Sequence, residues 1–266
     1  MARVNHKLVK QRLNEKRSKI SDRQFFTSRL LAGHFEDMAA AQTKRYHYQR
    51  RIHVTLLWEP KNKTVAFTDN QYITINAGNP FVTKTKGREN RYCIVLGLFA
   101  HELGHVLFTD FLAEQTYANR LELGMWYPEA PLLTTLMDRQ YEAELWDYLT
   151  EDPKNLEAAQ LVSHYLTNTV EDGYVENRML VSFPGSLASG LTDLRDIHYA
   201  DIPTVSEMVE QEETGDRHPF ETLLQMLLSY AKYGEIKYGD TPLTDERIRT
   251  VFSLIGTVDD ALMQPS

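Results

Sequence analysis

Apolar residues recur at steps of three and four along much of the chain, which is the spacing of amphipathic helices. The pattern predicts helices at about residues 3–50, 91–113, 130–150, 154–180, 219–233 and 243–256. Proline and glycine follow Phe183, so we expect residues 184–203 to form a long loop. The helix at 91–113 carries His101 and His105 on the same side as its apolar residues.

Residues 52–76 change to short runs of β-branched and aromatic residues. The runs are IHVTLLW, TVAF and QYITIN, separated by turn-forming residues, and they predict two or three strands. The expected fold is α+β: mostly helical, with a small N-terminal sheet packed against the helix at 91–113. The expected organisation is a helical segment at 1–50, a core at 51–182, and a C-terminal loop and helices at 183–266 that belong to the same domain.

Composition narrows the class of protein. The 266 residues have ordinary globular composition, and a net charge of −8 argues against a whole-molecule electrostatic grip on nucleic acid. The single cysteine, Cys93, excludes an internal disulfide. The polar N-terminus lacks the apolar core of a secretion signal, and the longest apolar run, residues 93–100, is too short to span a bilayer. We therefore expect a cytoplasmic protein with no membrane partner.

Basic residues dominate the first part of the chain, residues 3–23. Two interpretations stay open: a solvated helix face, or an arm that binds nucleic acid or an acidic partner. The basic positions are Arg3, Lys7, Lys10, Arg12, Lys16, Arg17, Lys19 and Arg23, against Glu15 and Asp22.

Residues 101–105 read His-Glu-Leu-Gly-His. Positions i and i+4 of a helix share one face, so His101 and His105 can reach one metal ion. Zinc suits neutral imidazole nitrogens in a tetrahedral site that keeps one position open. Glu102 is rotated by about 100° from His101, which suits a general base beside the site. The alternative is a pair of core histidines with Glu102 on a solvated face.

Catalytic zinc needs a third protein ligand. A metzincin would have glycine at position 108 and histidine at 111, whereas this chain has Phe108 and Phe111. The best candidate is Glu171, with Asn168 one turn before it and Asp172 as a hydrogen-bond acceptor for a ligating imidazole. Other carboxylates that remain open as ligands are Asp172, Glu176, Glu142 and Glu144.

The motif His101-Glu102-Leu103-Gly104-His105 with a distant Glu171 resembles the gluzincin branch of the zincin metallopeptidases. More narrowly, HELGHVLFTDF followed by NTVEDGYVE resembles predicted metallopeptidase domains of phage and mobile elements, which often accompany von Willebrand A-type domains. The resemblance covers about residues 91–180. It implies one Zn²⁺ per chain on His101, His105 and Glu171, with Glu102 as base.

The zincin resemblance also implies a strand along the cleft that pairs with an extended substrate. The counterpart would be the last strand before the helix, with residues Tyr72, Ile73, Thr74 and Ile75. A residue that stabilises the transition state is expected as well, and the sequence does not rank the candidates. They are His164, Tyr174, His198, Tyr199 and His218.

The function that these observations favour is zinc-dependent hydrolysis of peptide bonds in a protein or peptide substrate. One alternative is a binding or regulatory module that keeps the fold without turnover. A second is a nucleic-acid-binding protein that uses the basic arm and a structural zinc.

Overall fold

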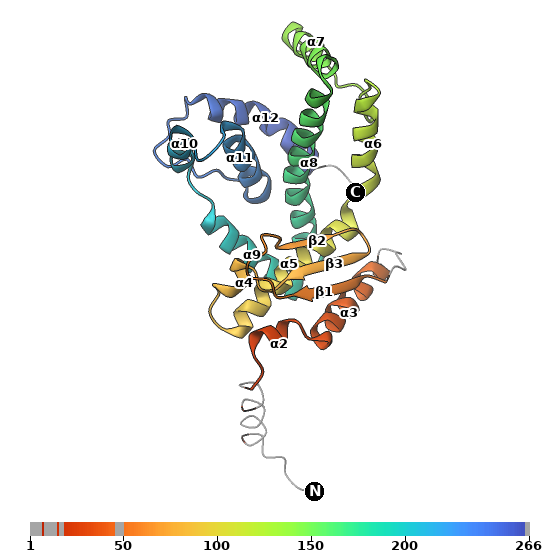
Figure 1. Cartoon of the computed structure of the whole chain (residues 1–266), viewed down its shortest axis with the longest axis vertical. Helices are drawn as coiled ribbons and strands as arrows, with labels where there is room; N and C mark the ends of the chain where they lie inside the picture. The colour runs from red at the N-terminus through yellow and green to blue at the C-terminus, as the bar shows by residue number, and fades with distance from the viewer. Residues whose placement is uncertain (1–6, 8–14, 16–18, 46–50, 264–266) are drawn as a thin grey trace. The chain divides into compact units, whose positions relative to one another are not determined.

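The computed structural model describes residues 7, 15, 19–45 and 51–263, apart from the side chain of Glu114. These residues are mostly helical with one small mixed sheet, which confirms the α+β class (Figure 1). The chain divides into two compact units, each built from two stretches. Unit 1 comprises Met1–Leu107 and Arg178–Asp201, and unit 2 comprises Phe108–Asn177 and Ile202–Ser266. The domain division expected from the sequence stays a prediction.

Unit 1 contains the sheet and the helix that bears the histidines. Most of the basic arm and residues 46–50 of the first expected helix lie outside the described residues. The elements are α2 (Asp22–Phe26), α3 (Arg29–Arg45), β1 (His53–Leu57), β2 (Ala66–Thr68), β3 (Tyr72–Asn76), α4 (Pro80–Thr83), α5 (Arg88–Phe108) and α9 (Ser186–Asp201).

The three strands lie where the sequence predicts them, and β3 is the central strand. It pairs in parallel with β1 and antiparallel with β2, and the strand order is β1-β3-β2. Residues Ile73, Thr74 and Ile75 have a partner on both sides, and Tyr72 pairs with His53. The expectation that β3 pairs with a substrate is therefore wrong, because its backbone hydrogen bonds are made within the sheet.

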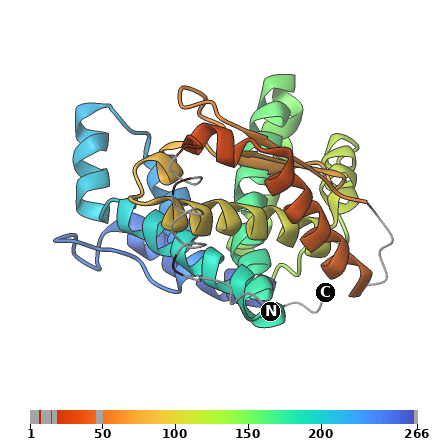
Figure 2. The same ribbon diagram turned by 90° about the horizontal axis from the view of Figure 1, so that it is seen from below.

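Helix α5 runs through the core of unit 1. Every residue from Ile94 to Ala100 is buried, as expected for a helix that is packed on all sides. The ring of Phe99 stacks on that of Phe35 in α3, with centroids 4.7 Å apart. The sheet lies next to α5 in both views (Figures 1 and 2). Ile73 and Ile75 of the central strand are fully buried.

Helix α9 crosses α5 at a pair of glycines. A Cβ on Gly97 would overlap the carbonyl oxygen of Gly190 and lie 2.8 Å from Leu194 Cβ. A Cβ on Gly190 would lie 3.0 Å from the Cys93 carbonyl oxygen. The two backbones can meet only because both positions lack a side chain. This crossing lies one turn before His101 and fixes α5 against its neighbour.

The prediction of a long loop at residues 184–203 is wrong, because most of this segment is α9. Its buried residues Leu187, Leu191 and Leu194 recur at steps of four and three. Pro184 and Gly185 interrupt the chain only between α8 and α9, where Gly185 has a φ of 120°.

The start of α5 is held by ionic contacts to α2. Arg88 Nε lies 2.6 Å from Asp22 Oδ1, and Arg91 also pairs with this carboxylate. Burial by itself would raise the pKa of Asp22, but the hydrogen bonds and charges of the two arginines hold that pKa below its usual value.

The C-terminal end of α5 differs from the expected helix at 91–113. The helix ends at Phe108, and a new helix, α6 (Phe111–Glu122), follows. Asp110 caps α6, because its carboxylate accepts hydrogen bonds from the backbone N–H groups of Leu112 and Ala113. Leu112 therefore does not share a continuous helix face with the histidines.

Unit 2 is all-helical within its described residues. Its core includes buried Val205, Met208, Met226, Ile248 and Val251. Besides α6, its helices are α7 (Leu136–Glu151), α8 (Pro153–Ser182, to residue 177), α10 (Val205–Thr214), α11 (Pro219–Tyr233) and α12 (Glu246–Leu262).

The described part of the chain contains no single helix with both the length and the apolar character needed to cross a membrane.

The glycine crossing predicts a clear effect of Gly97→Ala. The added methyl group would have to displace the backbone of α9, so we expect a loss of about 1–3 kcal/mol in the free energy of unfolding, measured by urea denaturation. Gly33→Ala in α3 is the matched control, because no atom lies within 4 Å of the added methyl group. The control should be neutral or stabilising by up to about 1 kcal/mol. Equal stability of the two variants would contradict the packing role.

Candidate metal centre

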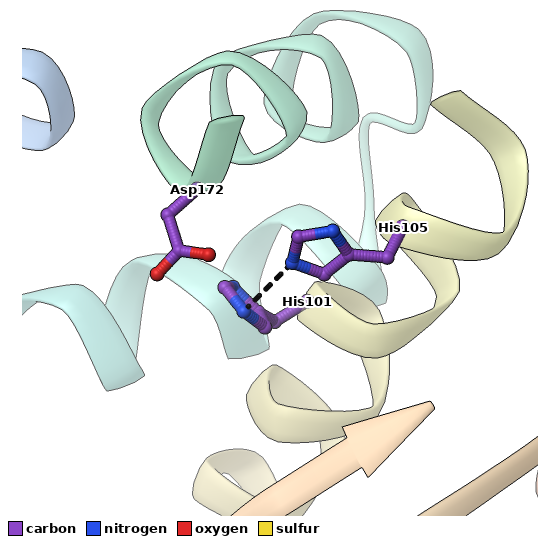
Figure 3. Close-up of side chains that lie close together, drawn as sticks. All are labelled: His101, His105 and Asp172. Atoms are coloured by element: carbon purple, nitrogen blue, oxygen red, sulfur yellow. Dashed lines mark hydrogen bonds between the residues drawn. The ribbon is translucent and has the colours of Figure 1, made fainter. Parts of the chain in front are cut away.

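The two histidines of the motif lie one turn apart on α5 and approach each other through their Nε2 atoms. These atoms are 3.3 Å apart, and the ring planes make an angle of 74° (Figure 3). Both residues are partly exposed, whereas residues 102–104 between them are buried. The imidazoles therefore form a pair at the border of the core of unit 1.

The distance between the two nitrogens fits a shared zinc ion. Zn–N bonds of about 2.0–2.1 Å at the tetrahedral angle place two ligating nitrogens about 3.3–3.4 Å apart. Without an ion, the same two nitrogens form a hydrogen bond, which Figure 3 draws as a dashed line. The donor chemistry agrees with the distance, because neutral imidazole is a preferred zinc ligand.

Glu102 is buried, with 6% of its surface exposed. The part of the alternative interpretation that placed Glu102 on a solvated helix face is therefore wrong. Burying a carboxylate is costly without compensating contacts. The side chain of Glu102 therefore lies on the packed side of α5, between the two histidines of the motif.

Of the carboxylates considered as third ligand, Glu171, Asp172 and Glu176 lie on α8 and the other two lie on α7, all in unit 2. Figure 3 draws Asp172 from this helix together with the two histidines. Within unit 2, Asp172 Oδ2 lies 3.4 Å from Lys232 Nζ, and Glu176 Oε1 lies 2.7 Å from the same nitrogen. Asn168 Nδ2 lies 3.1 Å from His164 Nε2, so these two residues form a pair one turn apart.

Lys232 is a residue that the sequence reasoning missed. It is 7% exposed, and burial by itself would lower its pKa, but the charges of Glu176 and Asp172 hold that pKa above its usual value. Gly173 lets α11 approach this point closely, because a Cβ there would lie 3.0 Å from Ala231 Cβ. The sequence signal was a lysine inside the apolar run of α11.

Several other candidates have contacts that give them another role. Glu142 accepts a hydrogen bond from Trp126 Nε1 at 2.8 Å, and Glu144 accepts one from Gln140 Nε2 at 2.7 Å. Glu176 is 2% exposed and forms an ion pair with Lys232. Asp172 shares this lysine with Glu176, so the ion pair does not separate these two carboxylates as ligands.

Two of the histidines considered as transition-state stabilisers make structural contacts. His218 is the N-cap of α11, where its Nδ1 accepts a hydrogen bond from Phe220 N at 3.1 Å. His198 in α9 packs against Phe81, with ring centroids 6.0 Å apart. His164 lines a pocket in unit 2 with Tyr117 and Tyr127.

Comparisons of the chain with protein-family models, with curated proteins and with solved structures gave no match.

The buried ion pairs predict that Lys232→Met destabilises the protein. The variant leaves Glu176 buried opposite an apolar side chain, so we expect a loss of about 3–5 kcal/mol in the free energy of unfolding, measured by urea denaturation. Lys154→Met replaces an exposed lysine on α8 and should change that free energy by less than about 0.5 kcal/mol. Equal effects of the two substitutions on the free energy of unfolding would show that the ion pairs of Lys232 do not stabilise the protein.

Proposed function

We propose that the chain is a zinc-dependent peptide hydrolase whose metal is held by His101 and His105 and by a carboxylate of α8. The observation that carries the proposal is the distance of 3.3 Å between the two Nε2 atoms, which suits one tetrahedral ion. The third ligand is Glu171, as the zincin resemblance implies, with Asp172 as the alternative.

Zinc bound by three protein ligands would lower the pKa of a water molecule to about 7 and polarise a substrate carbonyl. Glu102 is the base of the reaction. It accepts a proton as the water oxygen bonds to the carbonyl carbon, and it gives that proton to the amine nitrogen as the C–N bond breaks. Glu102 therefore takes up one proton and releases one proton in each cycle, and its carboxylate is ionised again at the end.

The rigidity of α5 supports this assignment. Catalytic groups act best when the scaffold holds them in place before the reaction. The buried segment Ile94–Ala100 and the crossing at Gly97 hold the helix directly before the motif. His101, Glu102 and His105 thus lie on one of the most firmly packed elements of unit 1.

The ligand assignment predicts the zinc content of purified full-length protein. Wild type should bind about one zinc per chain, and His101→Ala should lose it, as measured by mass spectrometry of the metal after dialysis against a zinc buffer. Glu171→Ala and Asp172→Ala separate the two ligand candidates. Replacing the residue that binds the metal should lower zinc affinity by more than about 100-fold. Replacing a residue that only hydrogen-bonds a ligand typically lowers it by roughly 10–100-fold.

His34→Ala is the control for zinc content, because His34 is an exposed histidine of α3 in the same unit. It should bind zinc like wild type. Retention of wild-type zinc by His101→Ala would contradict the metal centre. Equal retention by both α8 variants would contradict a carboxylate ligand at residues 171–172.

The role of Glu102 predicts a variant that binds metal but does not react. Glu102→Gln keeps the shape of the side chain and removes its basicity, so zinc content should stay the same. The rate of peptide cleavage should fall by about 10²–10⁴-fold. A peptide library incubated with the zinc-loaded chain and read by mass spectrometry gives the rate.

Glu89→Gln is the matched control, because Glu89 is an exposed carboxylate in the first turn of α5. It should cleave like wild type. If Glu102→Gln and wild type cleave at the same rate, the assignment of the base is wrong. If zinc-loaded wild type cleaves no peptide, the interpretation as a binding module replaces the proposed function.

A further inference from the structure

A pocket of about 480 Å³ lies within unit 2, between α6, the segment at Tyr127 and α8. This volume falls within the range of roughly 300–1,000 Å³ found for sites that bind small molecules or side chains. Most of its lining is apolar. The residues that define its chemistry are Ala118, Tyr117, Tyr127, Ser163, His164 and Thr167.

The pocket combines aromatic walls with a polar side. Tyr117 and Tyr127 are its aromatic lining residues, and Ala118 on α6 is one of its small lining residues. The Tyr117 hydroxyl lies 3.4 Å from Ser163 Oγ, which ties the wall on α6 to α8. Aromatic rings prefer offset or edge-to-face neighbours, and such pairs add about 0.5–1.5 kcal/mol to burial alone. The lining therefore suits an aromatic side chain of a ligand.

The pocket lies on the same face of α8 as Glu171. Ser163, Thr167 and Glu171 follow one another at steps of four, so each lies one turn beyond the last. Four residues of helix advance about 6 Å. An extended peptide covers about 3.3 Å per residue. The near edge of the pocket is thus about two peptide residues along α8 from Glu171.

We propose that this pocket receives an aromatic side chain of the peptide substrate, at a position within about two residues of the cleaved bond. The proposal rests on the proposed function, because it takes Glu171 as a marker of the reacting centre. Phenylalanine, tyrosine and tryptophan are the side chains that the pocket selects. The hydroxyl groups of Ser163 and Thr167 and the imidazole of His164 form the polar side of the pocket, where the polar tip of tyrosine or tryptophan would lie.

Binding by the pocket can be measured without catalysis. The probes are N-acetyl-L-tryptophanamide and N-acetyl-L-alaninamide, added to the zinc-loaded full chain with ¹³C-labelled alanine methyl groups. Ala113 and Ala118 line the pocket and report directly, whereas Ala143 is exposed on α7 and serves as the reference signal. The tryptophan amide should shift the Ala113 and Ala118 signals and bind at least tenfold more tightly than the alanine amide.

Ala118→Leu fills the pocket with a side chain that a helix accepts well, and Ala143→Leu is its matched control. The first variant should abolish the Ala113 shift and lower kcat/KM for peptides with an aromatic residue near the cut by at least tenfold. Its zinc content should not change. Ala143→Leu should behave like wild type.

The possible results separate this proposal from the proposed function. Equal binding of the two amides, or equal cleavage of aromatic and aliphatic peptides by wild type, would overturn the aromatic pocket. Aromatic binding at Ala113 and Ala118 without cleavage of any peptide would support the ligand class and contradict the peptidase. Cleavage with an aromatic preference that Ala118→Leu removes would support both.

Discussion

One turn of α5 sets the distance between His101 and His105, and the proposed chemistry depends on this spacing. The Nε2 atoms lie 3.3 Å apart, close to the separation that two ligands of one tetrahedral zinc ion adopt. A helix delivers this geometry from sequence spacing alone, provided that it stays straight and in place. The rest of unit 1 secures that condition: Arg88 and Arg91 fix the first turn on Asp22, and the glycine crossing fixes the middle.

Unit 2 contains a buried cluster of charged residues around Lys232. Lys232 is buried with two carboxylates of α8, and this cluster carries more negative than positive charge. Such a cluster is stable only while its members stay paired, which makes α8 sensitive to substitution on α11. The residues proposed to contact metal and substrate, Glu171 and Thr167, lie on this same helix, so its packing governs both proposals.

The elements with a strong local signal were predictable. The strands follow from runs of β-branched residues, and the start of α11 follows from Pro219 after His218. Helix α9 was missed because Pro184 and Gly185 were given more weight than the leucines that follow them. The end of α5 was missed because Asp110 acts as a cap inside an apolar pattern that otherwise continues. The short helices α4 and α10 were missed too, although capping residues Asn79 and Thr204 mark their starts.

The candidate site also has a part that local sequence predicts and a part that depends on contacts between distant segments. Its histidine pair follows from spacing within one helix, so the sequence alone predicts it. The order of the strands depends on pairing between distant segments, and so the role of β3 was wrong. Lys232 and the pocket at Ala118 and Tyr127 arise where separate helices meet, and no local pattern marks such a meeting point.

The most direct test of the metal centre is a crystal structure of the zinc-loaded chain with anomalous diffraction recorded on both sides of the zinc absorption edge. The account predicts one anomalous peak about 2.0–2.1 Å from Nε2 of both His101 and His105, with a carboxylate oxygen of α8 as a further ligand. A peak elsewhere, or no peak beside these two nitrogens in zinc-loaded crystals, would contradict the central claim.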